Sequence, residues 1–176
     1  MKHLILTTLL LASPVLASEK IFVGFQAGRM QTDRAITIKG GITGITASTE
    51  NGATFFTRPV KTNISVSYMA GEFTTASFKT PVISMQKEIS LTNQFKGFYP
   101  SAFGGVAYKF IDTVMPTPQQ RDPMINSRLH FDLGLGINYA SNKWRLGIKY
   151  LHKSNGEIAL PNRGYNFVLI ELTFLI

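Results

Sequence analysis

Hydrophobic and polar residues alternate along most of this chain, in segments of about ten residues with turn residues between them. The clearest segment covers residues 129–139, where every odd-numbered position is large and apolar and the positions between are small or polar. A period of two is that of a β-strand, because successive side chains point to opposite faces. Short alternating segments of this kind predict an all-β fold, an antiparallel transmembrane β-barrel.

Further strands are predicted on both sides of this segment. Residues 144–152 and 165–175 alternate just as clearly, whereas the upstream pattern is less sharp. The upstream candidates are residues 21–27, 35–47, 85–95 and 101–111, together with the region 51–85, which is long enough for two strands. The pattern does not fix the registers between residues 50 and 95. We predict eight strands, the smallest usual even number for an outer-membrane barrel.

The polar faces of these strands carry glycine and a few charges of both signs, such as Asp132, Glu171, Arg145 and Lys149. In a soluble β-sandwich, the alternative fold, such charges would be solvated on the outside. The lumen of a small barrel is instead filled by side chains, and charges buried there must find partners. We therefore expect the polar faces to line the lumen and the apolar faces to meet lipid.

The connections between strands predict the orientation of the barrel. Outer-membrane barrels have short periplasmic turns and longer external loops. Residues 140–143 form a tight turn, which we place in the periplasm, and the proline-containing segment 112–127 is long, which we place outside. The segment 144–152 then runs outward, so that His152 lies at its external end, and the C-terminus lies in the periplasm.

The N-terminus has the pattern of a secretory signal peptide. A short polar start precedes the apolar run of residues 4–11, and Val15-Leu16-Ala17 resembles a cleavage site, so we assign residues 1–17 to the signal and 18–176 to one barrel domain. The alternative, a membrane anchor, is disfavoured because the apolar run is too short to span a bilayer. The chain has no cysteine, so an exported barrel must be held by packing and hydrogen bonds.

The net charge of +8 has two readings in an exported chain. Nucleic acid is not an expected partner there. Cationic loops are attracted to membranes with anionic headgroups, and outer-membrane lipids are the partners we expect. Ordinary solvation of loops would give the same charge, and charge alone does not separate the two readings.

His152 and Ser154 stand two residues apart, which places both side chains on one face of an extended strand. The rest of that face is apolar, with Trp144, Ile148 and Tyr150 among its members. A serine hydroxyl is a weak nucleophile until an adjacent base takes its proton. The pair therefore predicts a base and a nucleophile at a lipid surface. The alternative is a polar position beside a turn, since Ser-Asn-Gly is a common turn sequence.

Two stretches carry a family resemblance: Arg128-Leu129-His130-Phe131 through Asn155-Gly156, and Pro161-Asn162-x-Gly164-x-Asn166. They resemble the PagL family of lipid A 3-O-deacylases. The resemblance is specific over about the last third of the chain, and over the first half only the strand rhythm agrees. It implies an eight-stranded outer-membrane barrel, a serine esterase without a cofactor, that hydrolyses the 3-position acyl ester of lipid A within lipopolysaccharide in the outer leaflet.

The resemblance also implies roles for individual residues. Ser154 matches the nucleophile, His152 the general base, and Asn155 the asparagine that helps to form the oxyanion hole. The third, orienting residue is a glutamate in the best-known member, and Asn166 stands at that position here. An asparagine can orient an imidazole but supplies no negative charge. Glu157 is a nearby acid that offers an alternative, although the resemblance gives it no role.

We expect the acyl chain of the substrate to lie against Ile148, Tyr150 and Val168, and its head group to meet Lys153 and Arg163. His130 is expected to belong to the polar lumen, and no cluster of side chains predicts a metal. Two alternatives stay open: a non-catalytic, structural or lipid-binding barrel of the same family, and a surface-interaction barrel that uses residues 112–127. The sequence does not decide between a monomer and a homodimer.

Overall fold

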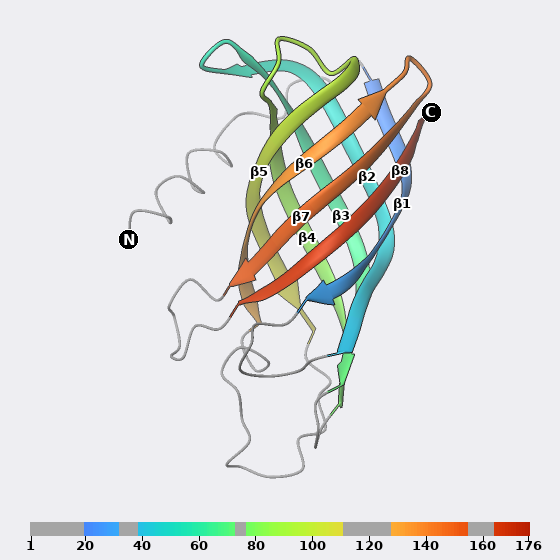
Figure 1. The fold of residues 1–176 in the computed structure, drawn as a ribbon, viewed down its shortest axis with the longest axis vertical. Helices are drawn as coiled ribbons and strands as arrows, with labels where there is room; N and C mark the ends of the chain where they lie inside the picture. The colour runs from blue at the N-terminus through green and yellow to red at the C-terminus, as the bar shows by residue number, and fades with distance from the viewer. Residues whose placement is uncertain (1–19, 32–38, 73–76, 111–127, 155–163) are drawn as a thin grey trace.

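The computed structural model describes residues 20–31, 39–72, 77–110, 128–154 and 164–176. They form one closed antiparallel barrel of eight strands, in which each strand pairs with its chain neighbours and the first pairs with the last (Figure 1). The strands are β1 (Lys20–Gln31), β2 (Lys39–Phe55), β3 (Arg58–Glu72), β4 (Ser77–Ser90), β5 (Gly97–Lys109), β6 (Leu129–Ala140), β7 (Trp144–Ser154) and β8 (Tyr165–Leu175). The predicted fold class and strand number are confirmed. The predicted signal peptide lies outside the described residues.

The last three strands lie where the alternation predicts them, whereas several upstream bounds are displaced. The strand expected at 35–47 covers Lys39–Phe55, and the region 51–85, expected to hold two strands, holds β3 with the end of β2 and the start of β4. The strand expected at 85–95 begins at Ser77 and ends at Ser90, and the strand expected at 101–111 covers Gly97–Lys109. The strand ends at Ser90 because its side chain takes part in a local turn. The Ser90 hydroxyl donates to the carbonyl of Gln94 at 3.0 Å and accepts from the amide of Thr92 at 3.2 Å. No helix in the described part of the chain is long and apolar enough to cross a membrane.

Apolar side chains cover the outside of the barrel. Ile137 is 68% exposed and Phe25 is 66% exposed, while their strand neighbours point inward and are buried. A continuous apolar surface of this size is unstable in water and fits the hydrocarbon of a bilayer. At the end of the barrel that holds the β6–β7 turn, Tyr139 contacts Phe98 and Trp144, with ring centroids 4.8 and 5.3 Å apart, and aromatic groups of this kind lie at the membrane interfaces of such barrels.

The lumen is filled by side chains and charges within it are paired, as predicted, but it also contains apolar side chains, which the alternation did not indicate. The buried carboxylate of Glu88 forms ion pairs with Lys61 at 3.2 Å and with Lys149 at 2.9 Å, and Lys149 also pairs with Glu171 at 2.9 Å. Toward the end of the barrel away from the β6–β7 turn, buried apolar residues form a cluster that includes Met30, Ile42, Met69, Phe78, Leu151 and Phe167. The inside of the barrel is therefore filled by side chains.

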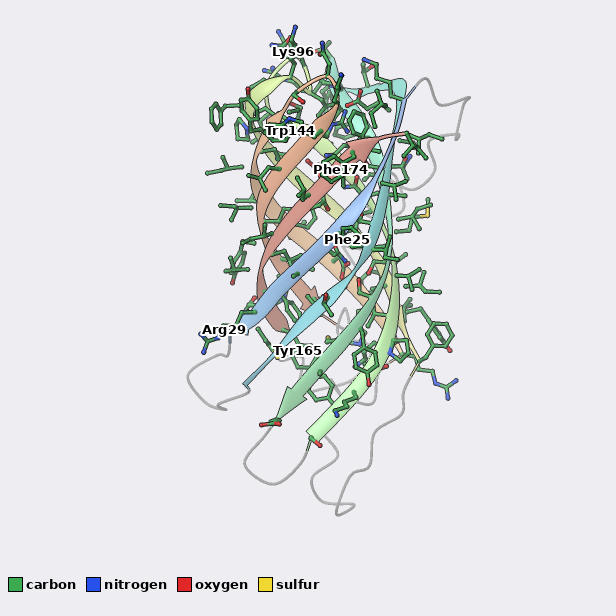
Figure 2. The ribbon with its side chains drawn as sticks, turned by 90° about the vertical axis from the view of Figure 1, so that its right-hand side faces the viewer. Phe25, Arg29, Lys96, Trp144, Tyr165 and Phe174 are labelled. Carbon is green, nitrogen blue, oxygen red and sulfur yellow. The ribbon has the colours of Figure 1, made fainter. Side chains whose placement is uncertain are left out.

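The two ends of the barrel differ in the way the prediction requires. Strands β6 and β7 are separated by only three residues, and the C-terminus lies at that same end (Figure 1). Figure 2 shows Trp144, Phe174 and Lys96 at this end and Arg29 and Tyr165 at the other. Because the short connection and the C-terminus mark the periplasmic side, the end of β7 and the start of β8 lie at the external side.

Candidate active site

His152 and Asn166 are brought together by the pairing of β7 with β8. The two residues are direct partners in the register of this hairpin, and both are half-buried on the lipid-facing side. The Nδ1 atom of His152 lies 2.8 Å from the Oδ1 atom of Asn166. Because an amide oxygen only accepts hydrogen bonds, this contact puts the imidazole proton on Nδ1. The Nε2 atom then carries the lone pair, which is the form needed in a general base.

Ser154 is the last residue of β7 and points to the same face as His152. It lies opposite Phe131 of β6 and is half-buried. Its hydroxyl forms no hydrogen bond with another described residue, His152 included. Catalytic hydrogen bonds are often long in the absence of substrate and tighten only when the substrate binds. The structure thus places the base and the hydroxyl on one face of β7, two residues apart, with no hydrogen bond between them.

Gly164 lies close against the imidazole of His152. A Cβ atom at position 164 would lie 2.2 Å from Cε1 and 2.6 Å from Nε2 of that ring, and 2.9 Å from the carbonyl oxygen of Lys153. Any side chain there would displace the imidazole, because real Cβ atoms do not approach other atoms so closely. In the sequence, Gly164 is part of the family motif, two residues before Asn166. The motif did not predict its contact with His152.

An apolar wall continues from His152 toward the middle of the barrel. Tyr150 pairs with Val168, and Ile148 pairs with Ile170 in the next row. Tyr150 and Ile148 are 47% and 57% exposed on the outer face. The three residues expected to line the acyl chain are thus neighbours in the structure, on the same face as the imidazole.

Lys153 lies inside the barrel, and the expectation that it meets a lipid head group is wrong. It is 2% exposed, and its Nζ atom pairs with the carboxylate of Asp132 at 2.7 Å. The physical reason is the strand period: because His152 and Ser154 point outward, the residue between them must point inward. Gln86 donates to the same carboxylate at 2.7 Å. Polar contacts inside the lumen therefore hold the strand end that carries His152 and Ser154 on its outer face.

The remaining predicted site residues are distributed as follows. Asn155, Glu157 and Arg163 lie outside the described residues, so the oxyanion hole, the alternative acid and the head-group contact stay predictions. His130 is 1% exposed and points into the lumen, as predicted. The described residues contain no group of three or more side chains arranged to hold a metal ion.

Comparison with known proteins gives one family and a matching fold. The family model described as Lipid A 3-O-deacylase (PagL) matches residues 43–174. A solved structure, "Crystal structure of the outer membrane enzyme PagL", matches with a TM-score of 0.50 and 15% sequence identity, covering 86% of this chain and 99% of that chain. At this identity the structural likeness establishes the fold. No curated protein matches the chain.

The family match begins in β2 and runs to the penultimate residue of β8, so it includes both strands that carry His152, Ser154 and Asn166. The closed eight-stranded barrel agrees with the solved outer-membrane enzyme. The match covers well over half of the sequence. This chain therefore belongs to the PagL family of lipid A 3-O-deacylases and is an outer-membrane β-barrel.

Proposed function

We propose that this protein is a lipid A 3-O-deacylase, a serine esterase in which Ser154 is the nucleophile, His152 the general base and Asn166 the residue that orients the base. The observation that carries the proposal is the hydrogen bond of 2.8 Å between His152 and Asn166 on the lipid-facing wall. A purely structural lipid-facing surface does not require a histidine held in a defined tautomer two residues from a serine whose hydroxyl has no hydrogen bond to another described residue. Its position at the external end of β7 matches the membrane leaflet that holds lipid A.

The chemistry proceeds in two halves. In the first, Nε2 of His152 takes the proton of the Ser154 hydroxyl as Oγ attacks the ester carbonyl carbon, and the resulting tetrahedral intermediate collapses with loss of the sugar oxygen. That oxygen receives the proton from the imidazolium. In the second, His152 takes a proton from water, the hydroxide attacks the acyl-enzyme, and Ser154 leaves with the proton restored. The products are a free fatty acid and a lipid A with one free hydroxyl group.

The tetrahedral intermediate carries a negative oxygen that needs hydrogen-bond donors held in place. We assign this role to Asn155, together with backbone amides of the segment that follows Ser154. Asn155 directly follows Ser154, the last residue of β7, in the sequence. Removal of a single donor of this kind costs about a hundredfold or more in turnover.

Asn166 can orient the imidazole of His152 but supplies no negative charge beside it. Its amide oxygen holds the Nδ1 proton, so it keeps the base in the right tautomer, but it cannot stabilise the imidazolium as a carboxylate does. We therefore expect turnover that is slower than in relatives with a glutamate at this position. This neutral residue is also the observation that favours the second candidate function, a lipid-binding barrel of the same family without catalysis. The third candidate, surface interaction through residues 112–127, concerns residues outside those described.

Mass spectrometry of lipid A tests the proposal. Cells whose lipid A carries a 3-O-linked hydroxyacyl chain would express the wild-type chain or Ser154→Ala, with heat-modifiable gel mobility to show that both barrels are folded. We expect the loss of one hydroxyacyl chain with the wild type and none with the variant. An unchanged lipid A spectrum in the presence of folded wild-type protein contradicts the deacylase proposal and supports the non-catalytic barrel.

A further inference from the structure

Arg29 is a cation on the lipid-facing wall beside the candidate active site. It lies on β1, is exposed, and pairs in register with Val168 of β8, which in turn pairs with Tyr150 of β7. Arg29 is thus separated from the strand of His152 and Ser154 by a single strand, or about 10 Å in two interstrand spacings. Figure 2 shows Arg29 at the same end of the barrel as Tyr165, the residue next to Asn166.

The described part of the barrel offers Arg29 no anion. A cation on the lipid-facing side of a barrel is tolerated near the membrane surface and disfavoured deeper in the hydrocarbon. No described residue forms an ion pair with Arg29, in contrast to the lumen cations Lys61, Lys149 and Lys153, each of which pairs with a carboxylate. At the level of the external headgroups, phosphate is the anion that a guanidinium binds best, because its planar donors match two phosphate oxygens.

We propose that Arg29 binds the phosphate group on the sugar that carries the scissile ester, and so orients the lipid at the active site. This inference rests on the proposed deacylase function. In lipid A the phosphate at carbon 1 and the ester at carbon 3 belong to one glucosamine ring, so anchoring one fixes the position of the other. Val168 of β8 pairs with both Arg29 and Tyr150, so the phosphate site adjoins the apolar wall for the acyl chain.

Lys79 provides a matched control for a specific phosphate contact. It is also exposed and outward-facing near the external end of its strand, and no described residue forms an ion pair with it. It lies on β4, which is across the barrel from β8 in the closed order of eight strands. A general attraction between cations and an anionic membrane surface would weaken equally on removal of either charge. A contact with the reacting lipid would depend on Arg29 alone.

The experiment measures binding and turnover separately. Binding would be followed by native mass spectrometry in detergent micelles, on full barrels carrying Ser154→Ala, with lipid A and with lipid A lacking the 1-phosphate. Turnover of the same two lipids would be measured on barrels with Ser154 intact. Each assay compares the parent, Arg29→Gln and Lys79→Gln, and thermal unfolding confirms that the variants are folded.

We expect Arg29→Gln to weaken binding of lipid A about fivefold and to raise KM with little change in kcat, whereas Lys79→Gln changes neither. Removal of the 1-phosphate should weaken binding to the parent by a similar factor and abolish the difference between the parent and Arg29→Gln. Equal binding by the parent and Arg29→Gln, or a difference that persists without the phosphate, overturns the inference. Phosphate-dependent binding without turnover would refute the deacylase proposal and leave the phosphate site standing.

Discussion

The imidazole of His152 and the amide of Asn166 face each other across two paired strands, with Nδ1 and Oδ1 2.8 Å apart. The contact depends on register, because a shift of one residue would send Asn166 into the lumen and remove the only described partner of the ring. The same pairing puts Tyr150 beside Val168 one row away. Register thus couples the orientation of the base to the assembly of the apolar wall.

Replacement of Asn166 by leucine should remove catalysis without unfolding the barrel. The position faces outward, so an apolar side chain is accommodated there, but His152 loses the acceptor that fixes its tautomer. We expect kcat to fall about a hundredfold, with KM changed little. The check is steady-state hydrolysis of lipid A by purified barrels in mixed micelles. A variant with wild-type kcat would mean that Asn166 does not orient the base.

Replacement of Asn166 by glutamate should have the opposite effect. A carboxylate accepts the Nδ1 proton more strongly than an amide and stabilises the imidazolium that forms during attack. We expect kcat to rise about tenfold, which corresponds to about 1.4 kcal/mol of additional transition-state stabilisation. The same assay measures it, with Ser154→Ala in the glutamate background as the control for adventitious hydrolysis. A fall in kcat would show that the site is adapted to a neutral residue.

Replacement of Gly164 by alanine should displace the imidazole. The added Cβ would stand 2.2 Å from Cε1 of His152, so the ring must move, and a shift of about 1 Å at a catalytic group can cost about a hundredfold in rate. We expect kcat to fall by that order while lipid A binding is retained. Comparison of binding and turnover separates this effect from misfolding, which would reduce both. Unchanged turnover would show that the ring has another productive position.

The C-terminal strands could be predicted from the sequence because their two faces differ so strongly. In β6 the outward residues are large and apolar, whereas the inward ones include Asp132 and two glycines, so only one register buries the polar set. The β2 segment offers no such contrast. Its outward positions Thr43 and Thr49 are as polar as the inward Thr46, so the pattern does not fix the bounds of this strand. The registers between residues 50 and 95 could not be predicted either.

The candidate site was predictable as far as it depends on a local motif. His152, Ser154 and Asn166 stand in one short stretch, and alternation puts all three on the outer face. The position of Lys153 was mispredicted although the same alternation places it inside the barrel. The contact between Gly164 and His152 joins the end of one strand to the start of the next. Such a contact depends on how the strands approach in space, which sequence spacing does not specify.

The ion pair between Lys153 and Asp132 should support the active site from inside the barrel. Both side chains are at most 2% exposed, so Lys153→Met would leave a buried carboxylate whose described contact is the amide of Gln86. Removal of one partner of a buried pair typically costs about 3–5 kcal/mol, whereas replacing both by apolar residues costs far less. We therefore expect Lys153→Met to lower the free energy of unfolding by about 3 kcal/mol and Lys153→Met with Asp132→Leu to recover most of it.

Denaturant unfolding in lipid vesicles would measure this free energy, with the fluorescence of Trp144, the only tryptophan of the chain, as the signal. Lys153 lies between His152 and Ser154 on β7, so a loosened strand end should also reduce turnover in the single variant and restore it in the double variant. Equal destabilisation by the single and double changes would mean that the pair contributes packing rather than charge compensation. Full stability with lost turnover would mean that Lys153 positions the end of β7 that bears Ser154 without contributing to the stability of the barrel.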